Sequence, residues 1–294
     1  MQAEAARKRD QFLHTLARRP AVMGILNVTP DSFSDGGQFN NVAAAVAQAK
    51  RLAAEGCDIV DIGGESTRPG ATPVSAADEL ARIEPVVAAL ARALDVALSI
   101  DTSKALVAQR AIELGAVLVN DVWGLQQDPA MAETIAAAQA AVVIMHNRSH
   151  IDATLDIISE IRGFFARSLK IADNAGIPRA HIILDPGIGF AKTSRQNCEA
   201  VARLSELGDW GLPLMEGASR KGFLGSLGTH GRERTVIGTL AANLAAAASG
   251  ASVFRVHDVA EHVTALTVFH TIRAAGAAAQ TGDVSAHNRS DPRR

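Results

Sequence analysis

The sequence predicts a single-domain α/β protein with the fold of a (β/α)8 TIM barrel. First, eight short apolar runs alternate with longer Ala-rich segments whose apolar residues recur with a helical period. Second, the apolar runs are continuous, which is typical of parallel strands covered on both faces. Third, a chain of 294 residues is long enough for this fold, which needs roughly 250 residues. An open doubly wound sheet is the alternative, because short strands are easily miscounted in one sequence.

Each predicted strand is a short apolar run, most of them rich in β-branched residues. In chain order the strands are residues 22–26, 59–62, 96–100, 117–119, 142–145, 182–184, 213–215 and 252–256. The clearest amphipathic helices between them are residues 42–55, 75–94 and 233–249. Four glycines are suited to the C-termini of helices, namely Gly56, Gly115, Gly176 and Gly250.

The chain divides into three parts. Residues 1–20 are expected to form a helical extension, and residues 21–277 the barrel. Residues 278–294 are polar and have no period, so we expect a disordered tail.

The composition argues against several classes of function. The 29 basic and 31 acidic side chains give a formal net charge of −2, and no basic cluster outside the termini suggests nucleic-acid binding. No run approaches the roughly 20 apolar residues of a membrane-spanning helix, and the charged amino terminus does not resemble a secretory signal. Two cysteines, Cys57 and Cys198, have no metal-type spacing and fit a reducing compartment. We therefore expect a cytoplasmic protein that acts on small molecules.

Nearly every predicted strand is followed by a polar side chain, at the end where barrel enzymes place their sites. These residues are Asn27, Asp61, Asp101, Asn120, His146, Asp185, Ser219, Arg220, Lys221, Arg255 and His257. Singly, such residues have structural explanations, since Asp101 could cap a helix and Asn120 could stabilise a turn. Together we expect them to face one opening. Residues 27–40 and 63–73, long segments at the same end, are predicted to be binding loops.

Seven motifs at these strand ends resemble the dihydropteroate synthase family over nearly the whole predicted barrel. They are MGILNVTPDSFSDGG from Met23, DIGGESTRPGA from Asp61, SIDTSK from Ser99, VNDVWGL from Val119, LDPGIGF from Leu184, GASRKGFLG from Gly217 and RVHDV from Arg255. The resemblance implies condensation of 6-hydroxymethyl-7,8-dihydropterin diphosphate with 4-aminobenzoate, giving 7,8-dihydropteroate and diphosphate. It also implies a role in folate biosynthesis, a target for sulfonamides and a homodimer that associates through helices far from the mouth.

The resemblance implies that Asp101 and Asp185 accept from the N–H donors of the pterin, which suits carboxylates. Asn120 adds an amide, and Lys221 donates to the acceptor side of the ring. Met145 is expected to form an apolar wall of the pterin site. Gly217 lies in the same set of substrate-binding residues.

The diphosphate end of the site is implied to contain Arg255, His257 and a Mg²⁺ ion bound by Asn27. Magnesium commonly has only one or two protein oxygens among its ligands. The implied reaction is ionisation at the pterin methylene, followed by attack of the aniline nitrogen, without a protein nucleophile. The implied catalytic residues are Lys221, Arg255, His257, Asp101 and Asp185.

The aminobenzoate end is implied to involve the second long loop and the motif after the seventh strand. The residues expected near this substrate are Thr67, Arg68, Pro69, Phe190, Ser219 and Lys221. In the first long loop, Asp31, Ser32, Phe33 and Asp35 are expected to close over the substrates. Glu216 departs from the family, which mostly has an apolar residue there, so a partly buried charged group is expected near the site.

Two other functions are compatible with the barrel. A catalytically silent pterin-binding paralogue would share the pterin contacts, but the recognition residues are present at every strand end. A pterin-dependent corrinoid methyltransferase would not need Ser219, Arg220, Lys221, Arg255 and His257, and the chain has no cobalamin-binding module.

Overall fold

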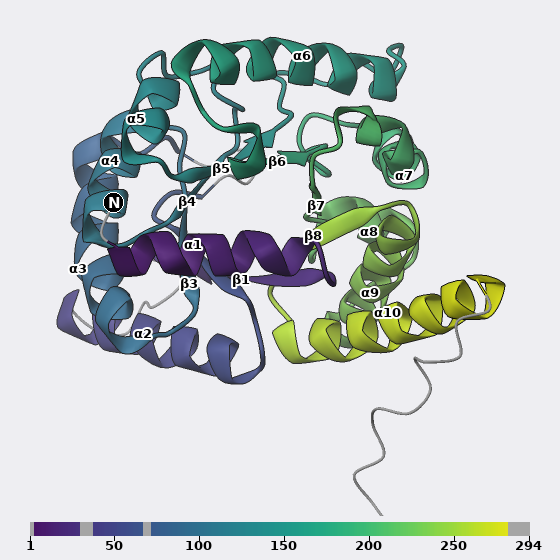
Figure 1. Ribbon diagram of the computed structural model, residues 1–294, viewed down its shortest axis with the longest axis horizontal. Coiled ribbons are helices and arrows are strands. Elements are labelled where there is room, and N and C mark those ends of the chain that lie inside the picture. Colours follow the sequence, from purple (N-terminus) through teal and green to yellow (C-terminus); the bar gives the residue numbers. More distant parts are fainter. Residues whose placement is uncertain (1–2, 30–37, 67–71, 282–294) are drawn as a thin grey trace, which may run out of the picture.

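The computed structural model describes residues 3–29, 38–66 and 72–281. Eight parallel strands pair in chain order, and β8 pairs with β1, so the sheet closes into a barrel (Figure 1). The strands are β1 (Ala21–Asn27), β2 (Ile59–Gly63), β3 (Ala97–Asp101), β4 (Leu118–Asp121), β5 (Ala141–Met145), β6 (Ile182–Asp185), β7 (Leu214–Glu216) and β8 (Ala251–Val256). The predicted barrel is thereby confirmed, and the open sheet is excluded.

Helices surround the strands and connect them. They are α1 (Ala3–Leu16), α2 (Gln38–Ala54), α3 (Ala76–Ala93), α4 (Ala105–Leu114), α5 (Met131–Ala138), α6 (Ile157–Ala175), α7 (Ser194–Ala202), α8 (Gly222–Ser226), α9 (Arg232–Ala248) and α10 (Val259–Thr281). Two short 3₁₀ helices, Arg179–His181 and Leu204–Trp210, precede β6 and β7. In the described parts of the chain, no helix is both long and apolar enough to cross a membrane.

Two predicted boundaries are wrong. The first long loop was expected to run to residue 40, but α2 already begins at Gln38. The tail was expected from residue 278, whereas α10 continues to Thr281, because its Ala-rich end favours a helix even without an apolar period. Residues 282–294, the rest of the expected tail, lie outside the described residues.

Local sequence signals explain several of the helix ends. The side chain of Ser75 accepts from Asp78 N at the start of α3, and Asp156 accepts from Ser159 N at the start of α6. These are ordinary N-caps, which satisfy amides that have no partner within the helix. At the other end of α6, Gly176 has a φ of 82°, a conformation that favours glycine, as the sequence predicted.

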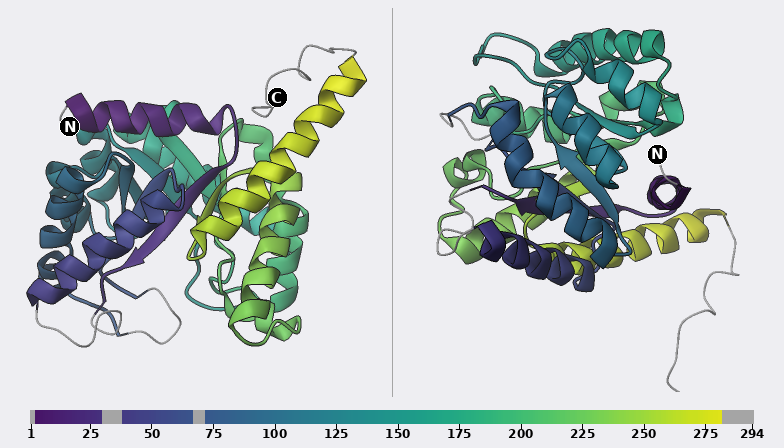
Figure 2. Two further views of the ribbon diagram at one scale, coloured as in Figure 1. Left: turned by 90° about the horizontal axis from the view of Figure 1, so that it is seen from below. Right: turned by 90° about the vertical axis from the view of Figure 1, so that its left-hand side faces the viewer.

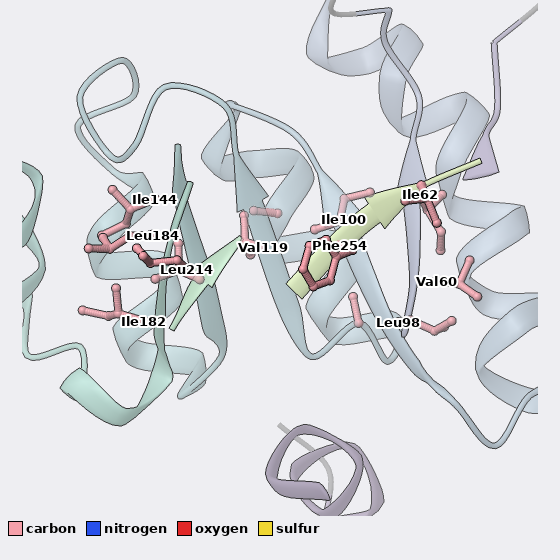
Figure 3. Packing of buried hydrophobic residues seen from close by; sticks show 14 of the residues in the cluster. Val60, Ile62, Leu98, Ile100, Val119, Ile144, Ile182, Leu184, Leu214 and Phe254 are labelled. Carbon is pink, nitrogen blue, oxygen red and sulfur yellow. The ribbon is translucent and has the colours of Figure 1, made fainter. Parts of the chain in front are cut away.

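Alternate strand residues belong to two hydrophobic layers. Residues such as Val60, Ile100 and Phe254 point outward and pack under the helices (Figure 3). Their neighbours in sequence, such as Ile59 and Val253, fill the inside of the barrel. Because successive strand residues point to opposite faces, the residue two positions after each inner apolar residue also faces inward.

Helix α1 covers the end of the barrel at which the strands begin (Figure 2). Its Ala5 and Phe12 belong to the inner cluster, together with Met23 of β1. The arrow of β1 points away from α1, toward the opposite end (Figure 2). The helical extension predicted for residues 1–20 thus corresponds to a helix that covers the amino end of the barrel. Active sites of such barrels lie at the opposite, carboxyl end of the strands.

Candidate active site

Four side chains form one hydrogen-bonded group at the carboxyl ends of β2, β3, β4 and β8. Arg255 Nε donates to Asp61 Oδ2 at 2.6 Å, and Arg255 Nη2 donates to Asp101 Oδ2 at 2.6 Å. Asn120 Nδ2 donates to Asp61 Oδ2 at 3.0 Å. All four are inward-facing residues of their strands. The structure therefore brings together Asp101, Asn120 and Arg255, as the sequence predicted, and adds Asp61 as a shared partner.

This group has spare acceptors. Asp61 Oδ1, Asp101 Oδ1 and Asn120 Oδ1 are buried and have no hydrogen-bond partner among the described residues. Native proteins rarely leave buried polar atoms unpaired without a reason, and a ligand is one such reason. Because all three atoms are assigned as acceptors, the ligand that suits them is rich in N–H donors.

The charges of this group depend on burial and on pairing. Burial raises the pKa of Asp101 to about 7, against the opposing effect of the Arg255 guanidinium. Burial alone would lower the pKa of Arg255, but Asp61 and Asp101 more than compensate and raise it above its ordinary value. Arg255 is therefore a permanent cation, whereas Asp101 can exchange a proton near neutral pH.

Asp185 and Lys221 form the second part of the site, at the ends of β6 and β7. Asp185 Oδ1 accepts from Gly187 N at 2.7 Å, and burial raises the pKa of Asp185. Lys221 donates to the carbonyl of Ile188, and its Nζ lies 4.1 Å from the centre of the Phe190 ring. Burial lowers the pKa of Lys221 to about 8, while Asp185 favours its charged form.

Ser219 and His257 connect the ends of β7 and β8. Ser219 Oγ lies 3.0 Å from His257 Nδ1 and accepts from His257 N at 3.1 Å. With the hydroxyl proton directed to Nδ1, the neutral imidazole has its proton on Nε2. The pair thus supplies an N–H donor beside Arg255.

Three further predicted residues lie at the same end of the barrel. A Cβ atom at Gly63 would lie 3.7 Å from Asn27 Oδ1 and 3.7 Å from Asp101 Cβ, so these two side chains converge. A Cβ at Gly217 would lie 3.9 Å from Arg255 Cβ. Met145 ends β5 opposite Asp185 in register and is buried.

Two residues of the predicted ring do not face the common opening, which corrects that expectation. His146 is buried beside α6, with its ring in edge contact with Phe164 at 5.0 Å between centroids. Arg220 is turned toward Asp258, and its Nε donates to Asp258 Oδ2 at 3.0 Å. His146 follows the inward-facing Met145 and so points outward. Arg220 lies in a turn and has a φ of 56°.

The long loops are partly outside the described residues. Thr67, Arg68 and Pro69, and also Asp31, Ser32, Phe33 and Asp35, belong to the parts that are not described. At the start of the second loop, Lys104 bonds to Glu65 and, at 2.5 Å, to the buried Glu79. Glu65 and Lys104 lie in two of the motifs quoted above, but no local pattern indicates that they pair with each other or with Glu79, since the three come from separate segments.

Glu216 lies in β7 as expected, but it is fully buried where partial burial near the site was expected, and it faces outward like its register partner Phe254. Neither carboxylate oxygen has a hydrogen bond of good geometry among the described residues. Burial raises the pKa of Glu216 to about 7; the Ala218 N–H and Lys221 oppose this shift, whereas Asp185 adds to it. The side chain lies behind the site and takes no part in the network of Arg255.

Comparisons with known proteins agree with this geometry. Residues 23–257 match the family described as pterin binding enzyme. The dihydropteroate synthase of Synechocystis sp. is 44% identical over 256 residues, which cover 85% of this chain and 89% of the relative. A Clostridium difficile dihydropteroate synthase, solved in the presence of pteroic acid, has a TM-score of 0.84 and 45% identity and covers 87% of this chain and 97% of its own. Xanthomonas albilineans dihydropteroate synthase, solved with 4-aminobenzoic acid, has a TM-score of 0.84 and 44% identity, with coverage of 87% and 94%.

Proposed function

The chain belongs to the pterin-binding enzymes and, among them, to the dihydropteroate synthases, and from this premise we propose how its residues act. The reaction is the condensation of 6-hydroxymethyl-7,8-dihydropterin diphosphate with 4-aminobenzoate to give 7,8-dihydropteroate and diphosphate. The observation that carries the assignment of residues is the set of unpaired buried acceptors on Asp61, Asp101 and Asn120 beside the Arg255 cation. A donor-rich heterocycle that bears an anionic group complements this arrangement.

The pterin binds to Asp101, Asn120 and Asp185. The guanidine-like edge of the ring presents several N–H donors, and carboxylates accept such donors in pairs. Lys221 donates to the carbonyl side of the ring, which requires its ammonium to leave the Ile188 carbonyl. Met145 forms an apolar wall next to Asp185. An analogue without the donor edge is rejected, because these buried acceptors would stay unpaired.

The leaving group binds to Arg255 and His257. Arg255 uses two N–H groups on Asp61 and Asp101, and a guanidinium has five. In the tautomer in which His257 Nδ1 accepts from the Ser219 hydroxyl, Nε2–H is the donor to the diphosphate. When the C–O bond at the pterin methylene breaks, its electron pair goes to the diphosphate, and these donors stabilise the charge that develops.

Asn27 is the proposed protein ligand of a Mg²⁺ ion. In the described residues there is no group of three or more His, Cys, Asp or Glu that could hold a metal, so a closed protein cage is not available there. One amide oxygen close to Asp101 fits an ion whose other ligands are diphosphate oxygens and water. When bound, Mg²⁺ supplies additional positive charge to the leaving diphosphate.

The aminobenzoate approaches from the side of Ser219, Lys221 and Phe190. The neutral aniline nitrogen attacks the methylene carbon, forms the new C–N bond and loses a proton. The protein contributes position and charge, and no side chain forms a covalent bond. Thr67, Arg68 and Pro69 are proposed to complete this end, with residues 31–35 above it.

The finer points of assembly and location also follow the family. We infer a homodimer, which exposed apolar side chains on α9 and α10 support: Ile237, Val268 and Ile272 are 59%, 54% and 66% exposed. A cytoplasmic location is consistent with the free cysteines Cys57 and Cys198.

Turnover with the purified protein tests the reaction, and two variants test the assignment of its two ends. His257→Ala should weaken binding of the pterin diphosphate by roughly 10- to 100-fold, the effect of one charged hydrogen bond, and leave binding of the unphosphorylated pterin unchanged. Asp185→Asn should weaken both, because an amide replaces one acceptor with a donor. Calorimetry in the presence and absence of Mg²⁺ measures these affinities.

Arg255→Ala is a less specific test of the diphosphate end, because Arg255 also binds Asp61 and Asp101, and its loss would affect the pterin end as well. If the unmodified protein binds the pterin tightly but releases no diphosphate from the substrate, a catalytically silent paralogue would be favoured. Equal losses of both ligands in His257→Ala would refute the role given to His257.

A further inference from the structure

The loop after β6, residues 186–192, is held by cations that bind its backbone carbonyl groups. Lys192 Nζ donates to Gly187 O at 2.7 Å and to Phe190 O at 3.3 Å. Lys221, from the next strand–helix connection, donates to the carbonyl of Ile188. Lysine side chains therefore bind this loop at three points of its backbone, and the two contacts of Lys192 remain when Lys221 turns to the pterin.

Arg148 adds a fourth point of attachment. It follows β5, and its Nη2 donates to Ala191 O at 2.6 Å. Ala191 has a φ of 41°, which is unusual for a residue with a side chain. The loop is thus held in a conformation that its own sequence does not favour, and external contacts must maintain it.

Lys192 lies at the centre of these contacts. It is 6% exposed, and its Nζ is 2.9 Å from Nδ1 of His146, which is fully buried. Burial and the neighbouring Lys192 lower the pKa of His146 to about 2, so the imidazole is neutral and Nδ1 accepts. Burial also lowers the pKa of Lys192 well below its ordinary value, and Asp185 opposes this shift. The three acceptors around Nζ match the three N–H groups of the ammonium form.

The contact between β5 and this loop is close. Gly187 has a φ of 66°, and a Cβ atom there would lie 1.9 Å from the carbonyl oxygen of His146. Only glycine permits this approach, which brings Lys192 Nζ within reach of His146. His146, which does not face the substrates, therefore has a defined function as part of the attachment.

The loop carries a contact to each substrate end of the proposed site. At its start, the Gly187 amide bonds to Asp185. Near its end, the Phe190 ring lies 4.1 Å from Lys221 Nζ. The position of Asp185 is fixed by β6, of which it is the last residue. The position of Phe190 is fixed only by the conformation of the loop.

We propose that Lys192 is a positioning residue for 4-aminobenzoate, which acts through the loop by holding Phe190 at the aminobenzoate end of the site. His146 and Arg148 act with it. The proposal rests on the function given above, in which Phe190 borders this substrate. Lys192 does not contact a substrate. It acts by fixing the position of the Phe190 backbone and ring.

Lys192→Met tests this, because methionine retains much of the chain length and loses all three hydrogen bonds. The KM for 4-aminobenzoate should rise by roughly tenfold to 100-fold, as expected for a displaced substrate contact. The Kd of the unphosphorylated pterin, measured by calorimetry, should change less than about threefold, because Asp185 stays on β6. Arg148→Met removes one hydrogen bond to the loop, from a partly exposed residue, and should raise the KM for 4-aminobenzoate by a smaller factor. This variant tests the proposal if Lys192→Met does not fold.

The control is Gln196→Met in α7. Gln196 is 2% exposed, its Nε2 donates to Asp152 O at 2.7 Å, and its Oε1 accepts from Thr193 N at 3.0 Å. The change therefore removes a buried bond to another loop together with one half of the capping box of α7. It should lower Tm and leave the ratio of the two affinities unchanged. If Lys192→Met and Arg148→Met only lower Tm like the control, or weaken both substrates equally, the positioning role is wrong. Failure of the unmodified protein to make dihydropteroate would instead refute the proposed function.

Discussion

At the amino end of the barrel the inward-facing strand residues are apolar, and on β2, β6 and β8 the next inward-facing residue toward the carboxyl end is charged. On β2, Ile59 packs inside the barrel and Asp61 binds a guanidinium; on β8, Val253 packs inside and Arg255 is that guanidinium. Two residues along a strand, about 7 Å, separate them. Apolar packing and charged chemistry therefore lie at different levels of one barrel, and we expect the apolar level to be changeable without loss of the chemistry.

The charged level is tolerated because its members neutralise one another. A buried ion costs several kcal/mol unless a partner and further hydrogen bonds compensate, and one cation here serves two carboxylates. The apolar level needs no such arrangement, since its residues pack against each other and against Phe12 of α1. A single substitution should thus be most costly where one residue serves two partners.

Arg255→Met gives the largest expected effect. It leaves Asp61 and Asp101 buried without their cation, and we expect a loss of about 4 kcal/mol in the free energy of unfolding at pH 8. Asp61→Asn should cost less, because the pair of Arg255 and Asp101 remains. Urea denaturation of both variants measures the difference. Equal costs would show that the group does not depend on its shared cation.

Phe12→Ala tests the other end and should cost about 3 kcal/mol, since Phe12 is 3% exposed and its removal leaves a cavity under α1. The kcat and KM of the folded protein should stay unchanged, because α1 lies at the far end of the barrel from the site. His14→Ala, an exposed position on the same helix, is the matched control and should alter stability by less than about 0.5 kcal/mol. A fall in kcat for Phe12→Ala would show that the two levels are coupled.

The sequence was sufficient for the strands and for most of the site, because hydrophobic period and polar strand ends are local signals. It did not distinguish Met145, which faces inward, from His146, which faces outward, since the exact last residue of a strand decides the face. Arg220 was misplaced for a related reason, because a turn with positive φ redirects it.

Contacts between distant segments left no such signal. Lys192 pairs with His146 across 46 positions of the chain, and nothing in either segment indicates the other. Asp61 was found as a polar strand end, but its function as the partner of Arg255 depends on the closure of β8 onto β1, which pairs with β2 on its other side. Tertiary arrangement, which a single sequence does not encode in any local pattern, was needed for both.

Glu216 sharpens the comparison, because it is an acidic group at the carboxyl end with no ion pair among the described residues, and it gives the smallest expected effect. Its pKa in the folded protein is raised from 4.5 to about 7, mainly by burial. A raised pKa means that folding favours the protonated form of Glu216. The contribution of Glu216 to the free energy of unfolding is therefore highest below pH 4.5 and falls as the pH rises through 7. Glu216→Gln should therefore gain about 2 kcal/mol at pH 8, somewhat less than the linkage amount of roughly 3 kcal/mol, because the amide is itself unpaired. At pH 4.5 the linkage amount is nearly gone, so the gain should be replaced by a loss of less than about 1 kcal/mol from the unpaired amide. Thermal unfolding at both pH values measures the change. A gain that does not depend on pH would show that the ionised carboxylate is not what destabilises β7, and the contrast with the neutralised charges around Arg255 would then lose its physical basis.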